Sequence, residues 1–330
     1  MTTLIPQKLF GTYDPRPGAG SLAATSIALL EEQKKTWPQL SQGYEGLSSV
    51  RVRDLSCHGF SVRLQYNPAR IVSSGAKVDP QSIKERRCFL CVENLPVEQN
   101  GILYREKFLV LCNPAPIFAR HYTISSVTHI PQELGSSLEI FLLLAKDLSP
   151  DFTVFYNGPK CGASAPDHLH FQASPAATIP VEIDVCANDR RILLKRGSGV
   201  SYWGLKAYGR EVLLVESSDL KELESALVKI IKTLRIVIAT SEEPMMNILC
   251  SYGDAMWRVI IFPRRKHRPD VYFLEGEASV LVSPASVDIG GLVVTPVEKD
   301  FLRIDARLIE DIFQEVTIGH DVMEKMTSLL

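Results

Sequence analysis

Residues 161–173 read CGASAPDHLHFQA, and polar and apolar side chains alternate through the HLHFQ at their centre. Successive side chains of a β-strand point to opposite faces of its sheet. The alternation therefore predicts a strand with His168, His170 and Gln172 on one face, beside a cleft. The leucine and the phenylalanine between them are predicted to point into a core.

The polar face of this strand has groups suited to the transfer of a phosphorus group. The residues before it are small, so backbone amides can approach an anion closely, and Gly162 and Ser164 are predicted to bind phosphate oxygens. A neutral imidazole whose second nitrogen is held by a hydrogen bond is a good nucleophile, the role predicted for His170. Gln172 is predicted to donate its amide N–H to a phosphate oxygen or to the leaving oxygen. These roles predict a covalent nucleotidyl-histidine, and the alternative is a solvated strand face without chemistry.

The bulk composition limits the classes of partner. The chain has 330 residues, 45% of them apolar, which fits one large domain or two modest ones. Its 36 basic and 38 acidic residues give a net charge of -2, so no global basic field is available to bind nucleic acid or a membrane surface. The sequence begins without a basic segment and apolar run, and no stretch approaches the about 18 apolar residues of a spanning helix. A cytoplasmic location is expected.

The cysteines suggest reduced thiols or metal ligands. Seven cysteines, an odd number, are scattered along the chain, which argues against a disulfide framework. Cys88 and Cys91 form a CxxC pair, a spacing that lets two thiolates bind one tetrahedral ion. His129 and His168 are the candidates to complete such a site. The alternatives are a buried reduced pair or a redox pair.

A pattern of strand, helix, strand and strand occurs twice. The first copy is predicted at 108–111, 133–146, 152–156 and 168–173, and the second at 212–215, 218–240, 246–252 and 257–262. The repeat predicts a pseudo-duplicated α+β fold, an antiparallel sheet with helices packed on it. In the second copy WRVIIFP replaces the strand that contains the histidines, so the active motif is expected only in the first half.

The predicted domains follow from this repeat. Residues 1–49, with a helix over about 23–37, are expected as an N-terminal appendage. Residues 50–185 form the catalytic half, with a further strand at 62–66, and residues 186–330 form a degenerate second half.

The segment HLHFQA resembles the histidine-triad superfamily, specifically its transferase and phosphorylase branch, in which glutamine is the third member of the triad. The branch includes galactose-1-phosphate uridylyltransferases, diadenosine tetraphosphate phosphorylases and the GDP-L-galactose and GDP-D-glucose phosphorylases, and the motif is most similar to the last group. SPASVDIGGLVV at 283–294 is similar to the same phosphorylases. The resemblance implies a histidine-triad-like fold and places His170 on the family's nucleophile.

The resemblance also suggests a metal and nucleotide contacts. In the uridylyltransferases a structural zinc is bound by a set that corresponds to Cys88, Cys91, His129 and His168, although the phosphorylase relatives lack the CxxC. If zinc binds, it would organise the nucleophile by positioning His168. Asn157 stands where the branch has a phosphate-contacting asparagine.

The stretch YNPARIVSSGAK at 66–77 is similar to a nucleotide-facing segment of the uridylyltransferases. The resemblance assigns Asn67 to the base or ribose, and Arg70 and Lys77 to phosphate charge. The alternative is a hairpin with solvated charges. The basic run at 264–268 is interpreted either as a solvated loop or as a site for polyphosphate, and His121 as structural.

The predicted reaction is a double displacement. His170 attacks the α-phosphorus of a nucleotide sugar or dinucleoside polyphosphate, and inorganic phosphate then accepts the nucleotidyl group, which makes the chain a phosphorylase. The alternatives are a uridylyltransferase with a sugar phosphate as acceptor, a hydrolase, and a non-catalytic nucleotide-binding zinc protein. A homodimer is a candidate assembly. The residues do not specify the base or the sugar.

Overall fold

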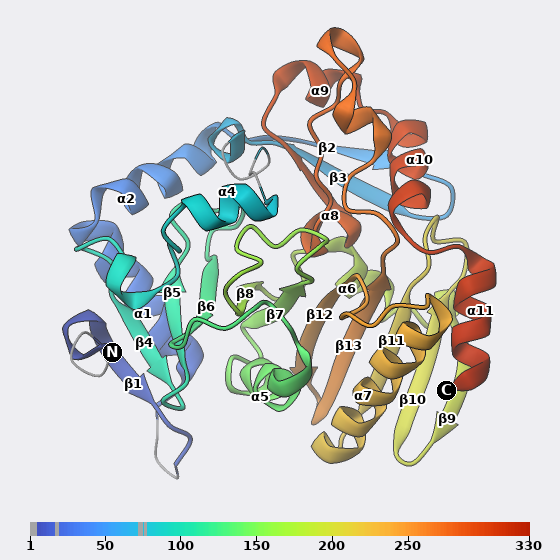
Figure 1. The fold of residues 1–330 in the computed structure, drawn as a ribbon, viewed down its shortest axis with the longest axis horizontal. Helices are drawn as coiled ribbons and strands as arrows, with labels where there is room; N and C mark the ends of the chain where they lie inside the picture. The colour runs from blue at the N-terminus through green and yellow to red at the C-terminus, as the bar shows by residue number, and fades with distance from the viewer. Residues whose placement is uncertain (1–4, 17–19, 72–74, 76–77) are drawn as a thin grey trace.

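The computed structural model describes residues 5–16, 20–71, 75 and 78–330 of the chain. Its main feature is one sheet of 11 strands that runs through both halves, in the order β1-β4-β5-β6-β8-β7-β12-β13-β11-β10-β9 (Figure 1). All neighbouring pairs in it are antiparallel except β1 with β4. The predicted α+β fold with an antiparallel sheet and packed helices is confirmed.

The strands of this sheet are β1 (Leu9–Tyr13), β4 (Gly101–Tyr104), β5 (Phe108–Cys112), β6 (Tyr122–Ser126), β7 (Phe152–Asn157), β8 (His170–Pro175), β9 (Arg191–Gly197), β10 (Val200–Leu205), β11 (Leu213–Ser217), β12 (Met246–Gly253) and β13 (Met256–Pro263). A second sheet of three strands has the order β14-β3-β2, from β2 (Arg51–Ser56), β3 (Ser61–Tyr66) and β14 (Leu292–Thr295). Since β3 and β14 come from opposite halves of the chain, this small sheet joins the halves.

The helices are α1 (Leu22–Thr36), α2 (Pro38–Glu45), α4 (Pro80–Glu85), α5 (Leu138–Asp147), α6 (Pro180–Asp184), α7 (Leu220–Val237), α8 (Ser286–Ile289), α9 (Glu298–Arg303), α10 (Ala306–Val316) and α11 (His320–Leu329). Among the described residues, no helix is both long enough and apolar enough to cross a membrane.

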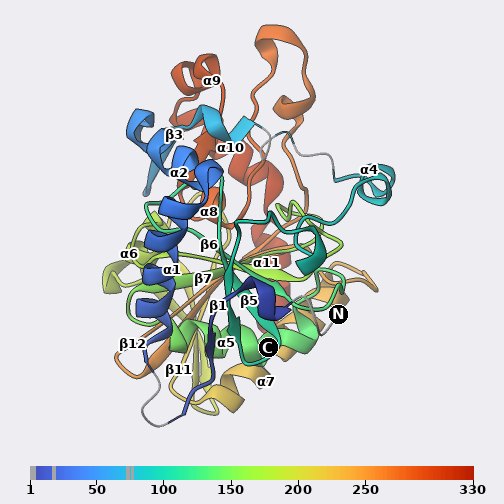
Figure 2. The same ribbon diagram turned by 90° about the vertical axis from the view of Figure 1, so that its left-hand side faces the viewer.

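The large sheet is covered on both faces, because its strands carry buried apolar side chains on each side. One core cluster contains residues of α1, α5, α7 and α11 together with Leu169 and Phe171. A second cluster lies on the opposite face, where β3, α8 and α10 pack on Phe155, Ile260 and Phe262. Figure 2 shows α5 and α7 at one end of the view and β3, α9 and α10 at the other. The prediction of helices on one face alone is therefore too simple.

The two halves of the sheet are related by the pair β7 and β12 at its centre. β8 flanks β7 as β13 flanks β12, and next come β6 and β11. The predicted repeat matched the strand at 212–215 with the one at 108–111, and this is corrected: the counterpart of β11 is β6, which sequence reasoning missed. The short YTISS of β6 has no clear alternation between polar and apolar residues, so its pattern gave no signal.

The N-terminal segment packs on the main body. Leu22, Leu29 and Leu30 of α1 are fully buried in the same cluster as β4 and β5. β1 pairs with β4 along the edge of the large sheet. The segment 1–49 is thus built into the core and does not lie apart from it as an appendage. The predicted boundaries at 49 and 185 stay predictions.

Candidate active site and metal centre

A cleft with a volume of about 530 Å³ lies beside β8, between loops of the two halves. The first half contributes predicted residues, namely Arg70, Asn157, Gly162, Ser164, His170 and Gln172. The second half contributes His267, Arg268, Ser283, Ala285, Val287, Asp288 and Val294. The cleft-side placement of His170 and Gln172 follows from the alternation of β8, since Phe171 between them is fully buried in the core.

The imidazole of His170 is held in one tautomer. Its Nδ1 lies 2.8 Å from the carbonyl oxygen of His168, which can only accept, so Nδ1 carries the proton. The Nε2 atom then has the free lone pair, and it has no hydrogen-bond partner among the described residues. Burial lowers the pKa of His170 to about 4, so the ring is neutral at pH 7. A neutral imidazole with a free Nε2 is the form that a nucleophile requires.

Gln132 holds the backbone around this histidine, and sequence reasoning missed it. Its Oε1 accepts from the His170 N–H at 2.8 Å, and its Nε2 donates to the His170 carbonyl at 3.0 Å. The same Nε2 donates to the carbonyl of Asn157 at 2.9 Å. One buried glutamine therefore joins the end of β7 to the start of β8 at the position of the nucleophile.

The side-chain amide of Gln172 is oriented by His121. The backbone N–H of Ile117 donates to His121 Nδ1 at 3.2 Å, so the proton of this neutral ring is on Nε2. That Nε2 lies 2.8 Å from Gln172 Oε1 and donates to it. Burial, with the charge of Arg70, lowers the pKa of His121 to about 3, which keeps the ring neutral. Because its oxygen is engaged, Gln172 presents its NH₂ group as the donor.

Asn157 is oriented in the same way from the second half. Its Oδ1 accepts three hydrogen bonds, from the N–H of Ser286 at 2.8 Å, from the Ser286 hydroxyl at 2.7 Å and from Asn247 Nδ2 at 2.9 Å. Its Nδ2 has no acceptor in the part of the chain that the structure describes. Since Asn157 lines the cleft, its NH₂ group is a second amide donor available to a ligand.

The loop before β8 needs a small residue at Gly162. Its φ is +108°, in the left-handed region, and a Cβ there would lie 2.6 Å from Cβ of Ala285 and 3.4 Å from Oδ1 of Asn157. Any larger side chain would thus collide with the segment that leads into α8. Ser164 lines the cleft two residues later.

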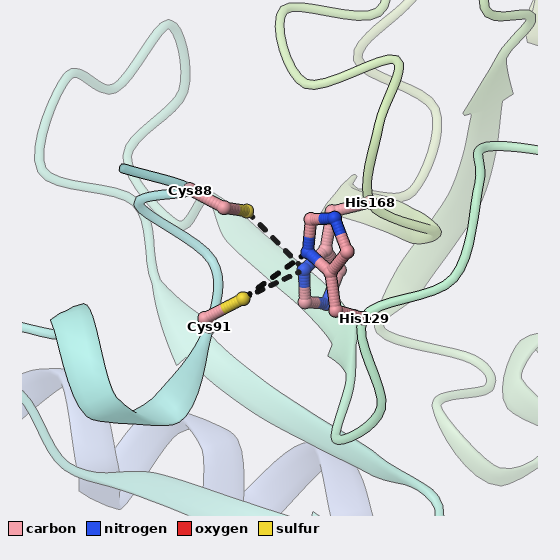
Figure 3. Close-up of side chains that lie close together, drawn as sticks. All are labelled: Cys88, Cys91, His129 and His168. Carbon is pink, nitrogen blue, oxygen red and sulfur yellow. Dashed lines mark hydrogen bonds between the residues drawn. The ribbon is translucent and has the colours of Figure 1, made fainter. Parts of the chain in front are cut away.

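The predicted metal ligands Cys88, Cys91, His129 and His168 gather in one group (Figure 3). Their ligand atoms all lie within 4.8 Å of one another. Cys88 Sγ is 3.3 Å from Nδ1 of His168, and Cys91 Sγ is 3.2 Å from Nδ1 of His129 and 3.6 Å from Nδ1 of His168. Zinc with its usual ligand bonds separates a tetrahedral sulfur and nitrogen by about 3.5 Å. The group is therefore already close to the geometry of a metal site.

His168 faces this group and not the cleft, which corrects the prediction that it shares a face with His170. β8 begins at His170, so His168 precedes the regular strand and is free of its alternation. Its Nε2 lies 2.8 Å from the carbonyl oxygen of Ser126, so the proton is on Nε2 and the lone pair of Nδ1 points to the two thiols. Such an outer hydrogen bond fixes the tautomer that a metal-binding histidine needs.

The remaining predicted contacts divide into three cases. Arg70 reaches the cleft, where its Nη1 donates to the carbonyl of Ala115 at 2.6 Å. Asn67 does not, because its buried side chain donates to the carbonyl of Pro116 at 3.2 Å, and the assignment to base or ribose is corrected to a structural role. Lys77 lies outside the described residues.

Two family models match the chain. A domain of unknown function, DUF4922, matches residues 29–175, and the model described as "GDPGP1-like, C-terminal domain" matches residues 185–330. No curated protein matches the chain.

Solved structures share the fold. Yeast Ap4A phosphorylase Apa2 is similar over 86% of this chain and 97% of its own, with 15% identity and a TM-score of 0.58. The same enzyme in complex with AMP is similar over 87% of this chain and 96% of its own, with 16% identity and a TM-score of 0.55. A uridylyltransferase mutant covers 68% of this chain and 88% of its own, at 10% identity and a TM-score of only 0.37.

Proposed function

Since the chain belongs to the transferase and phosphorylase branch of the histidine-triad superfamily, we propose that it is a phosphorylase that works through a nucleotidyl-histidine. The donor is a nucleotide sugar or a dinucleoside polyphosphate, and the acceptor is inorganic phosphate. The observation that supports this best is the geometry of β8, where a neutral His170 with a free Nε2 stands beside the amide donor of Gln172.

In the first step, Nε2 of His170 attacks the α-phosphorus of the donor. A phosphorus–nitrogen bond forms, and the bond from this phosphorus to the bridging oxygen breaks. The electron pair leaves with the sugar phosphate or nucleoside polyphosphate, which needs no proton because phosphate is a stable anion. Nδ1 keeps its proton and its bond to the His168 carbonyl, which stabilises the positive ring.

In the second step, an oxygen of inorganic phosphate attacks the same phosphorus and the phosphorus–nitrogen bond breaks. A nucleoside diphosphate leaves and the lone pair of Nε2 is restored. The amides of Gln172 and Asn157 act in both steps by donating to the phosphate oxygens as charge shifts among them. Arg70, whose pKa burial lowers to about 10, remains charged at pH 7 and attracts the anionic donor.

The group of Cys88, Cys91, His129 and His168 binds zinc in this proposal. Two sulfur and two nitrogen ligands suit a structural Zn²⁺ ion, and the hydrogen bond from His168 Nε2 to Ser126 leaves Nδ1 ready to coordinate. Bound zinc would provide no chemistry to the reacting phosphorus. It would fix His168, whose carbonyl oxygen in turn holds Nδ1 of the nucleophile.

A sugar phosphate is the second candidate acceptor, because the cysteine pair is similar to that of the uridylyltransferases. This acceptor would make the chain an exchanger of nucleotidyl groups. A homodimer and a cytoplasmic location stay predictions from the sequence.

The test is a screen of GDP-, ADP- and UDP-sugars and diadenosine polyphosphates, each with inorganic phosphate or with a sugar 1-phosphate. Release of a nucleoside diphosphate that requires phosphate is expected. The same donor without acceptor should leave a nucleotidyl adduct on the protein, labile to acid and stable to base, which intact mass spectrometry detects. Hydrolysis by water alone, or nucleotide binding without turnover, would contradict the proposal.

A further inference from the structure

Arg264, in the basic run after β13, is buried in the second half with only 1% of its surface exposed. Its guanidinium donates to five acceptors, all of them neutral. They are the carbonyls of Val316 (3.0 Å), Pro284 (2.9 Å), Lys266 (3.0 Å) and His267 (3.0 Å), and Oδ1 of Asn247. Every N–H of this side chain is therefore used.

The charge of Arg264 has no carboxylate within salt-bridge distance in the described part of the chain. Burial lowers its pKa to about 10, with a partly compensating effect from the carboxylate of Asp288, so it stays charged at neutral pH. A buried charge without an ionic partner is costly, and an apolar residue would avoid that cost. Full hydrogen bonding explains how the charge is tolerated, but not why it is there.

One contact of Arg264 leads toward the cleft. Asn247, which accepts from it, is the register partner of Asn157 across β12 and β7. Asn247 uses its own NH₂ group to donate to Asn157 Oδ1 at 2.9 Å and to the carbonyl of Cys161 at 2.7 Å. A positive donor thus polarises one amide, which donates to the next amide, whose NH₂ lies at the cleft.

We propose that Arg264 is a positioning residue for the phosphate site, acting through Asn247 on the amide of Asn157. The relay holds the NH₂ of Asn157 toward the α-phosphate of a nucleotide and strengthens its donation, because hydrogen bonds in a chain polarise one another. The buried charge also adds a fixed positive potential behind the cleft. This inference rests on the proposed function, since it takes a nucleotide phosphate as the ligand.

The variant that tests the relay is Asn247→Asp. Aspartate has nearly the same shape and can pair with Arg264, so the charge is neutralised where it stands and the packing is kept. It cannot donate to Asn157 or Cys161, so the relay is broken at its middle. Arg264→Met removes the charge itself, and Asn247→Asp keeps the proposal testable if that variant fails to fold.

Arg265→Gln is the matched control. Arg265 belongs to the same basic run but is exposed, and donates to the carbonyls of Gln314 and Glu315, each at 2.9 Å. Its loss changes the net charge by one, as Arg264→Met does, without touching the relay.

Affinities are measured by competition for ADP, GDP and UDP and for the three corresponding nucleosides. For the nucleotide that the wild type binds most tightly, we expect about tenfold or greater weakening in Asn247→Asp, the size of a lost charge-assisted hydrogen bond. The nucleoside affinity should stay within about twofold, and Arg265→Gln should match the wild type. Wild-type nucleotide binding without phosphorolysis, together with this pattern, supports the relay and rejects the phosphorylase.

Three results would overturn the relay. Equal weakening of nucleotide and nucleoside would mean a general packing role, unchanged nucleotide affinity would mean that the phosphate does not sense Arg264, and a wild type that binds none of the three nucleotides has no such site.

Discussion

Strands β8 and β13 occupy corresponding places on either side of the central pair β7 and β12, yet their cleft-side faces have opposite chemistry. β8 presents His170 and Gln172 to the cleft. β13 presents Ile260 and Phe262, which are buried in the apolar cluster with α8 and α10. The same backbone geometry thus supports a reaction in one half and a core in the other. The comparison teaches that the side chains on this face, and not the sheet, decide which half can catalyse.

The second half nevertheless contributes to the site. It supplies Ser286 and Asn247, which orient Asn157, and His267 and Asp288 on the cleft wall. The two halves therefore differ in task, with chemistry on one and orientation from the other.

The sharpest way to break the comparison is a pair of equivalent truncations. His170→Ala should lower turnover by about 10⁴-fold or more, since a covalent route loses its nucleophile, with little loss of stability. Ile260→Ala should do the reverse, costing about 3 kcal/mol of unfolding free energy through its cavity while turnover per folded molecule is kept. Steady-state kinetics and urea unfolding of both variants separate the effects. Retained turnover and adduct formation in His170→Ala would remove it as the nucleophile.

The second prediction concerns the metal that distinguishes the first half. Protein purified without added zinc should contain about one zinc per chain by elemental analysis. Cys91→Ser should lose it and unfold at a lower temperature, because binding of a structural metal contributes directly to folding. Cys186→Ser, at an exposed cysteine outside the group, is the matched control and should keep both metal and stability. A metal-free wild type with full activity would exclude the zinc site.

The third prediction tests the amide of Gln172. Gln172→Met keeps the length of the side chain but removes its donor, and should lower kcat by about 10²-fold, as the loss of one donor to developing charge does elsewhere. Affinity for the nucleotide donor should change less than kcat. Leu249→Met, on the corresponding face of the second half, serves as the control and should leave kcat unchanged. An equal effect of both variants would contradict a specific role for the amide.

The smallest effect is expected at the contact between the halves. Glu243, just before β12, accepts from the N–H of Leu134 at 2.7 Å and from the hydroxyl of Tyr156 on β7. Burial raises its pKa from 4.5 to about 7. The folded state therefore binds more protons than the unfolded state between these values, and this stabilisation is full below pH 4.5 and lost as pH rises through 7.

Between pH 5 and pH 8 the wild type should lose about 2 kcal/mol more unfolding free energy than Glu243→Gln, whose amide does not titrate. Urea unfolding at both pH values measures the difference. The same pH dependence in both proteins would show that Glu243 does not titrate in this range.

Much of the fold follows from local patterns. The alternation of β8, the 3.6-residue periodicity of α7 and the apolar β12 and β13 are strong signals over short stretches. β6 and the three-stranded sheet gave little or no such signal, because their partners come from distant segments such as β14. His168 was misplaced for a related reason, as its distance from the strand end depends on where Ser126 and the cysteine pair meet it.

The sequence by itself determined the chemical groups of this protein: the histidine and glutamine of β8, the cysteine pair and the small residues before the strand. Local rules were enough, because period-two alternation and ligand spacing act over a few residues. Tertiary structure decided how those groups are aimed. His170 is held by Gln132, 38 residues away, Gln172 by His121, 51 residues away, and Asn157 by Ser286, 129 residues away. Hydrogen bonds of such separation depend on the assembled sheet and leave no pattern in the chain.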